Sequence, residues 1–410
     1  MLRRLLASLL CFVFLVPAAQ AEDRTITSEQ FLDGLGLNVH LMYTDGGYAH
    51  LDKVLAALQY VGITHVRDVL PELYWLSEDR FKDASESGLQ FDLFIDGSVA
   101  FPDTLARLRQ FAKRYPGHLA VIEGPNEINN WPVKYRGMTG MEAAAALQTD
   151  LYEAARADDL LKNVPIYNYS GFPDRGGKAD FTNIHPYPKE GTQPRAELNR
   201  NLEIYSRLVP GKPLVITEVG YPTLRIPSSW GGVDGDTQAK LTLNLLFDAA
   251  LLGIGRTYVY QLLDAYPDKK GDEVDKHMGL FDLRYHPKPV ALAMHNLTTV
   301  LRAQSSAGGT AAVAVGSIAL EGLPRTARSL SIKSADGSTF VAVWNEPRIW
   351  DPDGFRPAPY TPVPVELKLG ASADVAEIDL LSSDAPKQTW SSTRSVQFLL
   401  GDRPLLFAVH

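Results

Sequence analysis

The chain has 410 residues, of which 45% are hydrophobic and 21% are charged, and its formal net charge is −8. This length and composition allow one large domain and a smaller one, each with its own buried core. The even spread of charged residues argues against wholesale disorder. The net negative charge disfavours a nucleic-acid partner, because phosphate binding needs a basic surface.

The first 21 residues have the three-part layout of a secretory signal peptide. Two arginines precede an apolar run, which ends in Ala19-Gln20-Ala21, the small residues that a signal peptidase needs. A membrane anchor is the alternative, but the run is short for a span of about 20 residues. We therefore expect cleavage after Ala21, no stable membrane insertion afterwards, and a periplasmic or secreted protein. The single cysteine, Cys11, would leave with this segment, so no disulfide is expected.

Strand-like and helix-like segments alternate from residue 34 onward. Apolar runs typical of buried strands occupy 34–41, 63–69, 89–96, 119–127, 164–171, 180–188, 212–220 and 256–264. Helical spacing occupies the gaps at 51–62, 75–88, 102–117, 141–159, 194–211, 237–255 and 288–303, and only the crossover at 173–178 is short and irregular.

Eight such units predict a parallel sheet closed into a (β/α)8 TIM barrel over residues 22–303. A doubly wound sheet is the alternative, but the glycine-rich phosphate turn is missing after the first strand. Beyond residue 303, short strands are separated by Gly, Asp, Ser and Pro, so residues 304–410 predict a smaller C-terminal β-sandwich. The proline-rich segment 348–362 is expected to be a loop, with a turn at its Asp-Pro-Asp-Gly stretch.

Two of the predicted barrel strands end in a glutamate. Glu127 closes the fourth strand, in VIEGPNE, and Glu218 closes the seventh, in VITEVGYP. The carboxyl ends of barrel strands meet at one face, where active sites are built. Paired carboxylates at such a face suit the cleavage of a glycosidic bond, since one protonates the leaving oxygen while the other attacks or activates water. A single glutamate is most often a solvated surface charge, whereas a pair at two strand ends is more specific.

Asn126-Glu127 and Thr217-Glu218 at these positions resemble clan A of the glycoside hydrolases, near families 5 and 39. The similarity extends over residues 34–303, and a trailing β-sandwich is common in such enzymes. The resemblance implies a retaining β-glycoside hydrolase that works by double displacement through a glycosyl-enzyme intermediate. It implies that Glu127 is the general acid/base, that Glu218 is the nucleophile, and that Asn126 binds the sugar 2-hydroxyl.

Three further residues fit the same resemblance. Arg67, in HVRD after the second strand, would lie beneath the nucleophile and keep it ionised, although an ion pair with Asp68 at the barrel rim explains it equally well. His185 and Tyr187, in NIHPYP after the sixth strand, are similar to the clan's His-x-Tyr pair. Tyr187 would then donate its hydroxyl to Glu218 and His185 would line the sugar site, while a rim histidine bonded to its neighbours is the alternative.

The end of the eighth strand departs from the clan pattern. Many members carry a tryptophan there, whereas this chain has Gln261 and Asp264. Gln261 is a candidate sugar ligand, and Asp264 either binds a sugar or caps the following loop. Glu123 precedes the Asn-Glu motif and is a rival for the role of the acid, but it is expected inside the barrel or paired with Arg67. Ionised Glu218 is expected to raise the pKa of its neighbour, so that the general acid stays protonated.

Aromatic residues gather in the predicted strand-to-helix loops, where they either stack on sugar rings or pack the loops: Tyr43, Tyr48, Trp75, Trp131, Trp230 and Tyr266. The nine histidines show no metal-ligand spacing, and no serine-hydrolase elbow is present. We therefore predict an exported, monomeric hydrolase of a polysaccharide or oligosaccharide that needs neither a cofactor nor a metal. A non-catalytic glycan-binding protein on a hydrolase scaffold and a transglycosylase are the alternatives.

Overall fold

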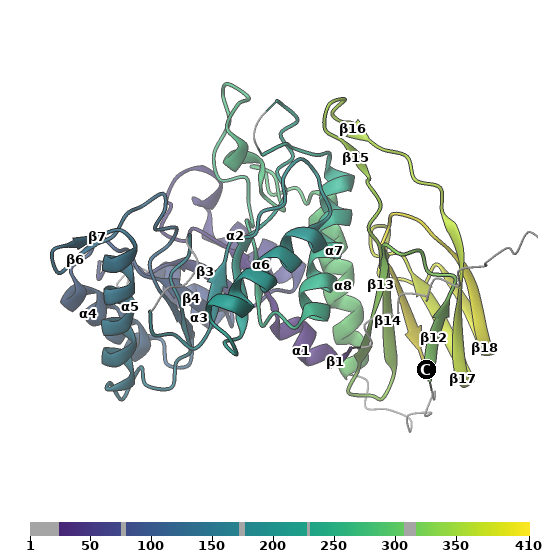
Figure 1. Ribbon diagram of the computed structural model, residues 1–410, viewed down its shortest axis with the longest axis horizontal. Helices are drawn as coiled ribbons and strands as arrows, with labels where there is room; N and C mark the ends of the chain where they lie inside the picture. The colour runs from purple at the N-terminus through teal and green to yellow at the C-terminus, as the bar shows by residue number, and fades with distance from the viewer. Residues whose placement is uncertain (1–23, 75–78, 172–176, 228–229, 307–316) are drawn as a thin grey trace, which may run out of the picture.

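The computed structural model describes residues 24–74, 79–171, 177–227, 230–306 and 317–410. A barrel of strands and helices lies beside a C-terminal sheet, which occupies the right-hand side of Figure 1. The predicted signal peptide, with Cys11, and the aromatic candidate Trp75 lie outside the described residues, so both stay predictions. Among the helices that are described, none combines the length and the apolar character needed to cross a bilayer.

Eight short parallel strands form the barrel, in the order β8-β5-β4-β3-β2-β11-β10-β9. A parallel bridge between Tyr167 and Phe181 joins the two ends of this sheet, which is therefore nearly closed. The (β/α)8 prediction is confirmed, and the doubly wound alternative is wrong. The strands are β2 (Leu35–Asn38), β3 (His65–Val69), β4 (Gln90–Phe94), β5 (Leu119–Glu123), β8 (Ile166–Tyr167), β9 (Thr182–Ile184), β10 (Leu214–Val219) and β11 (Thr257–Val259).

Helices follow seven of these strands within the described residues. Local signals fix their ends: the side chain of Asp234 accepts the Thr237 N–H at 2.7 Å at the start of α7, and α2 ends at Gly62 with a φ of 66°. No helix separates β8 from β9 in the described part of that crossover, as its irregular sequence indicated. The helices are α2 (Leu51–Val61), α3 (Asp79–Glu86), α4 (Phe101–Arg114), α5 (Met141–Arg156), α6 (Pro194–Leu208), α7 (Gly235–Leu252) and α8 (Pro289–Ser306).

The C-terminal region is an antiparallel sheet that folds back on itself, which confirms the predicted β-sandwich. Its long strand β17 shifts register between Lys368 and Ala373, and its two halves pair with β12 and β19 respectively. Only short strands were expected in this region, whereas Val363–Ile378 is one long, bent strand. The strands are β12 (Ile318–Glu321), β13 (Ala327–Lys333), β14 (Thr339–Asn345), β17 (Val363–Ile378), β18 (Gln388–Leu400) and β19 (Leu405–Val409).

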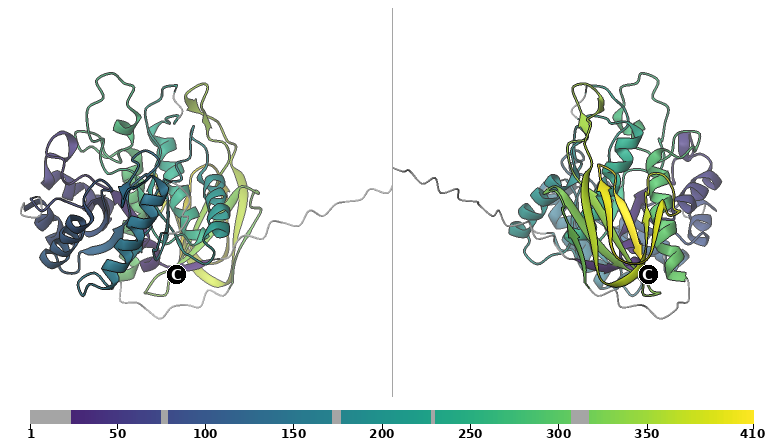
Figure 2. Two further views of the ribbon diagram at one scale, coloured as in Figure 1. Left: turned by 60° about the vertical axis from the view of Figure 1, so that its left-hand side comes forward. Right: turned by 90° about the vertical axis from the view of Figure 1, so that its right-hand side faces the viewer.

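The sheet packs against the barrel through alternate residues of its strands. In β14, Phe340 and Trp344 belong to the apolar cluster that also contains barrel helices, whereas Val341 and Val343 face the other layer of the sandwich. The Trp344 ring lies 5.5 Å from that of Phe247 in α7. Figures 1 and 2 show this sheet standing along α7 and α8.

The start of the described chain also joins this sheet. Strand β1 (Thr25–Thr27) pairs in parallel with β13, and helix α1 (Ser28–Asp33) follows directly and leads into the first barrel strand. A capping box at Thr27 and Gln30 fixes the start of α1. The segment before the barrel is therefore tied to both parts of the molecule.

A hairpin of the C-terminal region reaches up to the carboxyl-end loops of the barrel (Figure 1). It consists of β15 (Trp350–Asp351) and β16 (Arg356–Pro357), with the expected turn between them. Trp350 packs with Tyr221 and Val233 in one buried cluster. The hairpin therefore braces the loop that follows β10.

Candidate active site

Arg67 organises the carboxyl end of the barrel. Its side chain is only 1% exposed, and all five of its N–H donors are used. Nε and Nη2 donate to the two carboxylate oxygens of Glu123 at 2.7 and 2.8 Å. Nη1 donates to Glu218 at 2.6 Å and to Asn38 at 3.0 Å, and Nη2 also donates to Asn126 at 2.8 Å. The planar guanidinium therefore ties together residues of β2, β5, β10 and the loop after β5.

Asp68, the alternative partner of Arg67, is engaged elsewhere. Its two carboxylate oxygens accept the backbone N–H groups of Leu41 and Val69 at 2.7 and 2.8 Å. Burial raises the pKa of Asp68 to about 7. Asp68 therefore fixes the loop after β2, and Arg67 binds Glu123 and Glu218 instead.

Glu218 is held on both of its carboxylate oxygens. Oε1 accepts from Arg67, and Oε2 accepts the Tyr187 hydroxyl at 3.0 Å. Nδ1 of His185 lies 3.7 Å from Oε2. The side chain is 12% exposed, so the carboxylate is fixed in orientation but open to the cavity.

Glu127 faces it from the loop after β5. Its backbone has a φ of 39°, an uncommon conformation for a residue other than glycine, and its N–H donates to Ser170 Oγ at 2.9 Å. Oε1 lies 3.0 Å from Nδ1 of His185, and Oε2 accepts from Asn130 Nδ2 at 2.8 Å. On the other side of its ring, His185 Nε2 lies 3.0 Å from Thr217 Oγ1, which sets the ring orientation.

The two glutamates lie a short distance apart. A carboxylate oxygen of each, together with a ring nitrogen of His185, all lie within 4.8 Å of one another. Carboxyl groups of retaining glycosidases are about 5 to 5.5 Å apart, whereas inverting ones are about 6.5 to 9.5 Å apart. The separation between Glu127 and Glu218 therefore suits direct attack on the sugar better than activation of an intervening water.

The expectation that Glu218 raises the pKa of Glu127 is wrong for this structure. The hydrogen bond from His185 is the largest influence on Glu127 and lowers its pKa below the usual value. Burial acts in the opposite direction, and the hydrogen bond from Asn130 lowers the pKa further. The free protein therefore favours the carboxylate form of this residue.

This environment predicts an unusual pH response. If Glu127 is the general acid, kcat/KM falls as the pH rises through its pKa. The substitution His185→Ala removes the largest lowering influence, so the basic limb of the kcat/KM profile should move to higher pH even as the maximum rate falls. Asn130→Ala should also move the basic limb to higher pH, but by a smaller amount. A basic limb that stays in place or moves to lower pH in His185→Ala contradicts this assignment.

A cavity of about 550 Å³ contains both glutamates. The predicted residues Asn126, Tyr187 and Trp131 line it together with Arg67, and Trp131 is 71% exposed. His185 lies behind them, with 6% of its side chain exposed. The cavity volume is in the range of small-molecule sites, about 300 to 1,000 Å³.

Gln261, predicted as a sugar ligand, is not among the described residues that line this cavity. It is 2% exposed and accepts the Tyr48 hydroxyl at 3.2 Å, while its Nε2 donates to the Asp275 carbonyl at 3.4 Å. It therefore supports the wall from behind. Asp264 accepts from Lys288 at 2.8 Å and from the Gly279 N–H at 2.9 Å. Of the two roles expected for Asp264, these bonds fit the capping of the following loop.

The wall also contains residues that no sequence motif had pointed to, among them Tyr260, His40 and Asp275. Tyr260 lines the cavity at the end of β11, so an aromatic ring does occupy the region where the clan carries tryptophan. His40 stacks on Tyr43 with ring centroids 4.6 Å apart, and burial lowers its pKa to about 4, so it is neutral near pH 7. Asp275 enters from the 3-10 turn Val274–His277, where burial and the charges of the two glutamates raise its pKa. Only Tyr260 had a usable signal, since it directly precedes a predicted site residue.

The aromatic candidates divide between the cavity and the loops. Tyr43 and Trp230 line the cavity. Tyr48 is fully buried, and the Tyr266 hydroxyl donates to Asp45 at 2.6 Å, so these two pack the loops.

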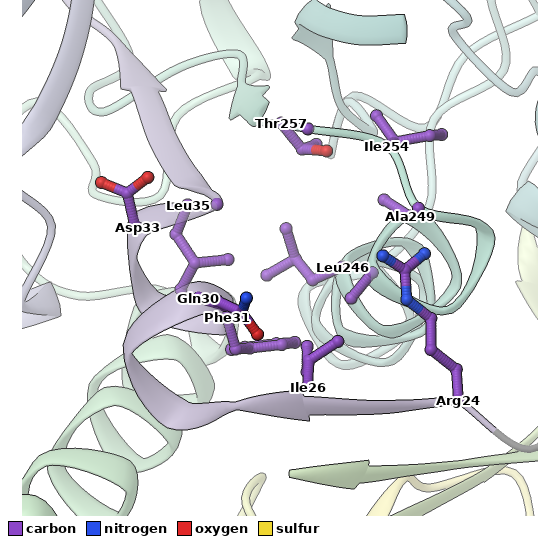
Figure 3. Close-up of a pocket in the computed structure, with 14 residues that line it drawn as sticks. Arg24, Ile26, Gln30, Phe31, Asp33, Leu35, Leu246, Ala249, Ile254 and Thr257 are labelled. Atoms are coloured by element: carbon purple, nitrogen blue, oxygen red, sulfur yellow. The ribbon is translucent and has the colours of Figure 1, made fainter. Parts of the chain in front are cut away.

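Another cavity, of about 280 Å³, lies at the opposite end of the barrel (Figure 3). Figure 3 shows Arg24 and Asp33 on either side of an apolar floor. Asp33 is already paired with His65 and Arg256, each at 2.8 Å. Residues at this end of a (β/α)8 barrel serve stability rather than catalysis. Asp33 is the only carboxylate among the described residues that line this cavity, so these residues do not repeat the pair of glutamates at the mouth.

No protein-family model matches the chain, and no curated protein matches it either. Solved structures do match. A family 39 glycoside hydrolase from Bacteroides cellulosilyticus has a TM-score of 0.63 at 14% identity, covering 94% of this chain and 82% of the other. A monomeric β-xylosidase from Caulobacter crescentus has a TM-score of 0.56 at 13% identity, covering 96% and 98%. A family 17 β-1,3-glucanosyltransferase from Rhizomucor miehei has a TM-score of 0.50 at 15% identity, covering 64% and 97%.

At these identities the matches show the fold. The first two extend over nearly the whole chain, so the combination of a barrel with a C-terminal sheet is shared with glycoside hydrolases near family 39. The resemblance to clan A is confirmed at this level.

Proposed function

We propose that this protein is an exported retaining β-glycoside hydrolase that cleaves a polysaccharide or oligosaccharide. The observation that carries the proposal is the convergence of Glu127 and Glu218 within 4.8 Å at the mouth of the barrel, each with its own set of donors. The fold shared with family 39 glycoside hydrolases supports it. Export rests on the N-terminal sequence, and the proposal of a monomer is supported by the Caulobacter crescentus β-xylosidase, which is described as monomeric.

In the first step a carboxylate oxygen of Glu218 attacks the anomeric carbon. The bond to the leaving oxygen breaks, and Glu127 transfers its proton to that oxygen. Arg67 and Tyr187 hold the Glu218 carboxylate in one orientation, so little reorganisation is needed at the moment of attack. A sugar that fills the cavity displaces water from around Glu127, which raises its pKa and favours the protonated form.

In the second step the roles reverse. Glu127, now a carboxylate, accepts a proton from water while the water oxygen attacks the anomeric carbon, and Glu218 leaves. Two inversions give net retention of configuration. Asn126 Oδ1 accepts from Arg67, so its Nδ2 is the donor available to the sugar 2-hydroxyl.

The charge of the cavity predicts which sugars it accepts. Glu127, Glu218 and Asp275 contribute carboxyl groups to its wall, and Arg67 is the one cation among the described residues that line it. Every donor of that arginine is already engaged. A sugar that carries a carboxylate would therefore meet repulsion without a compensating ion pair.

We accordingly expect a strong preference for uncharged sugars over the matching uronides. The preference should appear in kcat/KM for pairs of aryl glycosides that differ only in whether the sugar carries a carboxylate. The substitution Asp275→Asn removes one carboxyl group and should narrow the preference, on the order of tenfold. A parent enzyme that prefers the uronide, or an unchanged ratio in Asp275→Asn, would show that this wall does not set the selectivity.

The function is tested by incubating the protein with a panel of extracted glycans and following the first product by NMR. Turnover with retained anomeric configuration supports the proposal. Binding without turnover supports the glycan-binding alternative, and products longer than the substrate at high concentration support transglycosylation. Because Glu127, His185 and Glu218 also have the spacing of metal ligands, activity should be measured with a chelator as well, and we expect no loss.

A further inference from the structure

A further cavity lies directly beside the one that contains Glu127 and Glu218; these two are called here the second and the first cavity. It has a volume of about 510 Å³ and shares three lining residues with the cavity that holds the glutamates: Phe94, Asn126 and Trp131. It extends over the loops after β4 and β5, away from Glu218 and Tyr260, which line only the first cavity. The two cavities are therefore lobes of one cleft, and each is large enough for a small-molecule site.

Trp131 lies at the junction of the lobes. It is a large aromatic side chain with 71% of its surface exposed, although most tryptophans in folded proteins are largely buried. Its backbone is anchored, because its N–H donates to the Glu127 carbonyl at 2.9 Å. The main chain of Trp131 is thus anchored to the loop that carries Glu127, and its side chain lines both lobes.

The remaining wall of the second lobe combines apolar surface with a polar rim. Phe94, Pro125 and Pro132 provide the apolar part, and Asp96 and Ser98 provide the rim. Asp96 accepts from the backbone and hydroxyl of Ser98 at 2.8 and 2.7 Å, so both side chains are ordered at the edge. Sugar rings have an apolar face and a polar perimeter, and they match a surface of this kind.

We propose that this second lobe is a sugar subsite, with a ring of the glycan stacked on Trp131, so that the enzyme binds at least two neighbouring units of its substrate. The inference rests on the proposed function and deepens it. The lobe with the glutamates continues past Trp131 into the further lobe, so a glycan unit next to the one at the glutamates has a place to bind.

The test compares kcat/KM over a series of oligosaccharides of increasing length, prepared from the glycan that the parent enzyme turns over. In the parent, kcat/KM should rise with length until both lobes are filled. The substitution Trp131→Ala should remove this gain, on the order of tenfold or more for the longest member, because it removes the stacking surface. Trp131→Phe should keep most of the gain, since an aromatic ring remains.

A matched control is Leu160→Ala, which removes another exposed apolar side chain, at the opposite end of the barrel. It should leave the length dependence unchanged. Equal loss at every length in Trp131→Ala, or no rise of kcat/KM with length in the parent, would overturn the subsite. Absence of turnover in the parent would instead overturn the proposed function.

Discussion

Replacing Glu218 with glycine is expected to lower kcat by a factor on the order of 10⁴ or more, because no other group can form the glycosyl-enzyme bond. Sodium azide should restore turnover by entering the vacated space and attacking the anomeric carbon directly. A single displacement inverts configuration, so the glycosyl azide should have the opposite anomeric form to the substrate. NMR of the product identifies it.

The same experiment on Glu127 separates the two roles. Glu127→Ala should also lose most of its activity, but least on substrates whose leaving group needs no proton. Azide should then attack the glycosyl-enzyme and give a product with the original configuration. Glu190→Gln is a matched control, since this exposed glutamate follows the same strand as Tyr187 but does not line the cavity. Identical azide products from both variants would contradict the assignment.

Replacing Arg67 with methionine is expected to lower the free energy of unfolding by about 3 to 5 kcal/mol. Glu123 is fully buried, and the substitution leaves its carboxylate without its bidentate partner. Activity should fall as well, because Glu218 and Asn126 lose the donor that positions them. Chemical denaturation of the parent and the variant measures the difference in stability.

The double variant Arg67→Met with Glu123→Gln separates burial of an unpaired charge from general loss of packing. It should recover part of the lost stability, because the buried carboxylate is gone. Activity should stay low, since the donor to Glu218 is still absent. A loss below about 1 kcal/mol in the single variant would contradict the view that Arg67 supports a buried charge network.

Much of the barrel was predictable because its periodicities are local. Each strand is a short apolar run, and each helix has its own start and stop signals, as at Asp234 and Gly62. The sandwich was harder in detail. The bend in β17 depends on a register shift against β18, which one strand's sequence does not reveal.

The residues of the candidate site were likewise predictable only in part. Glu218 lies in β10, and Glu127 and Tyr187 lie in the loops after β5 and β9, a few residues beyond the ends of these strands, so their meeting follows from the topology of the barrel. His40 and Asp275 lie in loops that no local pattern places, and neither was predicted. Gln261 follows Tyr260 directly after β11. Tyr260 lines the cavity, whereas the side chain of Gln261 lies behind the wall and accepts the Tyr48 hydroxyl.

The lowered pKa of Glu127 shows why electrostatics could not be predicted from motifs. Its direction depends on the hydrogen bond from His185 at 3.0 Å, which outweighs burial. Without that contact, the pKa of Glu127 beside Glu218 would be expected to be raised.

Covalent trapping tests the central claim most directly. A 2-deoxy-2-fluoro glycoside with a good leaving group, built on the sugar that the enzyme accepts, slows hydrolysis of the glycosyl-enzyme and lets it accumulate. Mass spectrometry of the intact protein and of its peptides should locate one added sugar on Glu218. A label on any other residue, or continued turnover of the natural substrate with no label at all, would contradict a double displacement through Glu218.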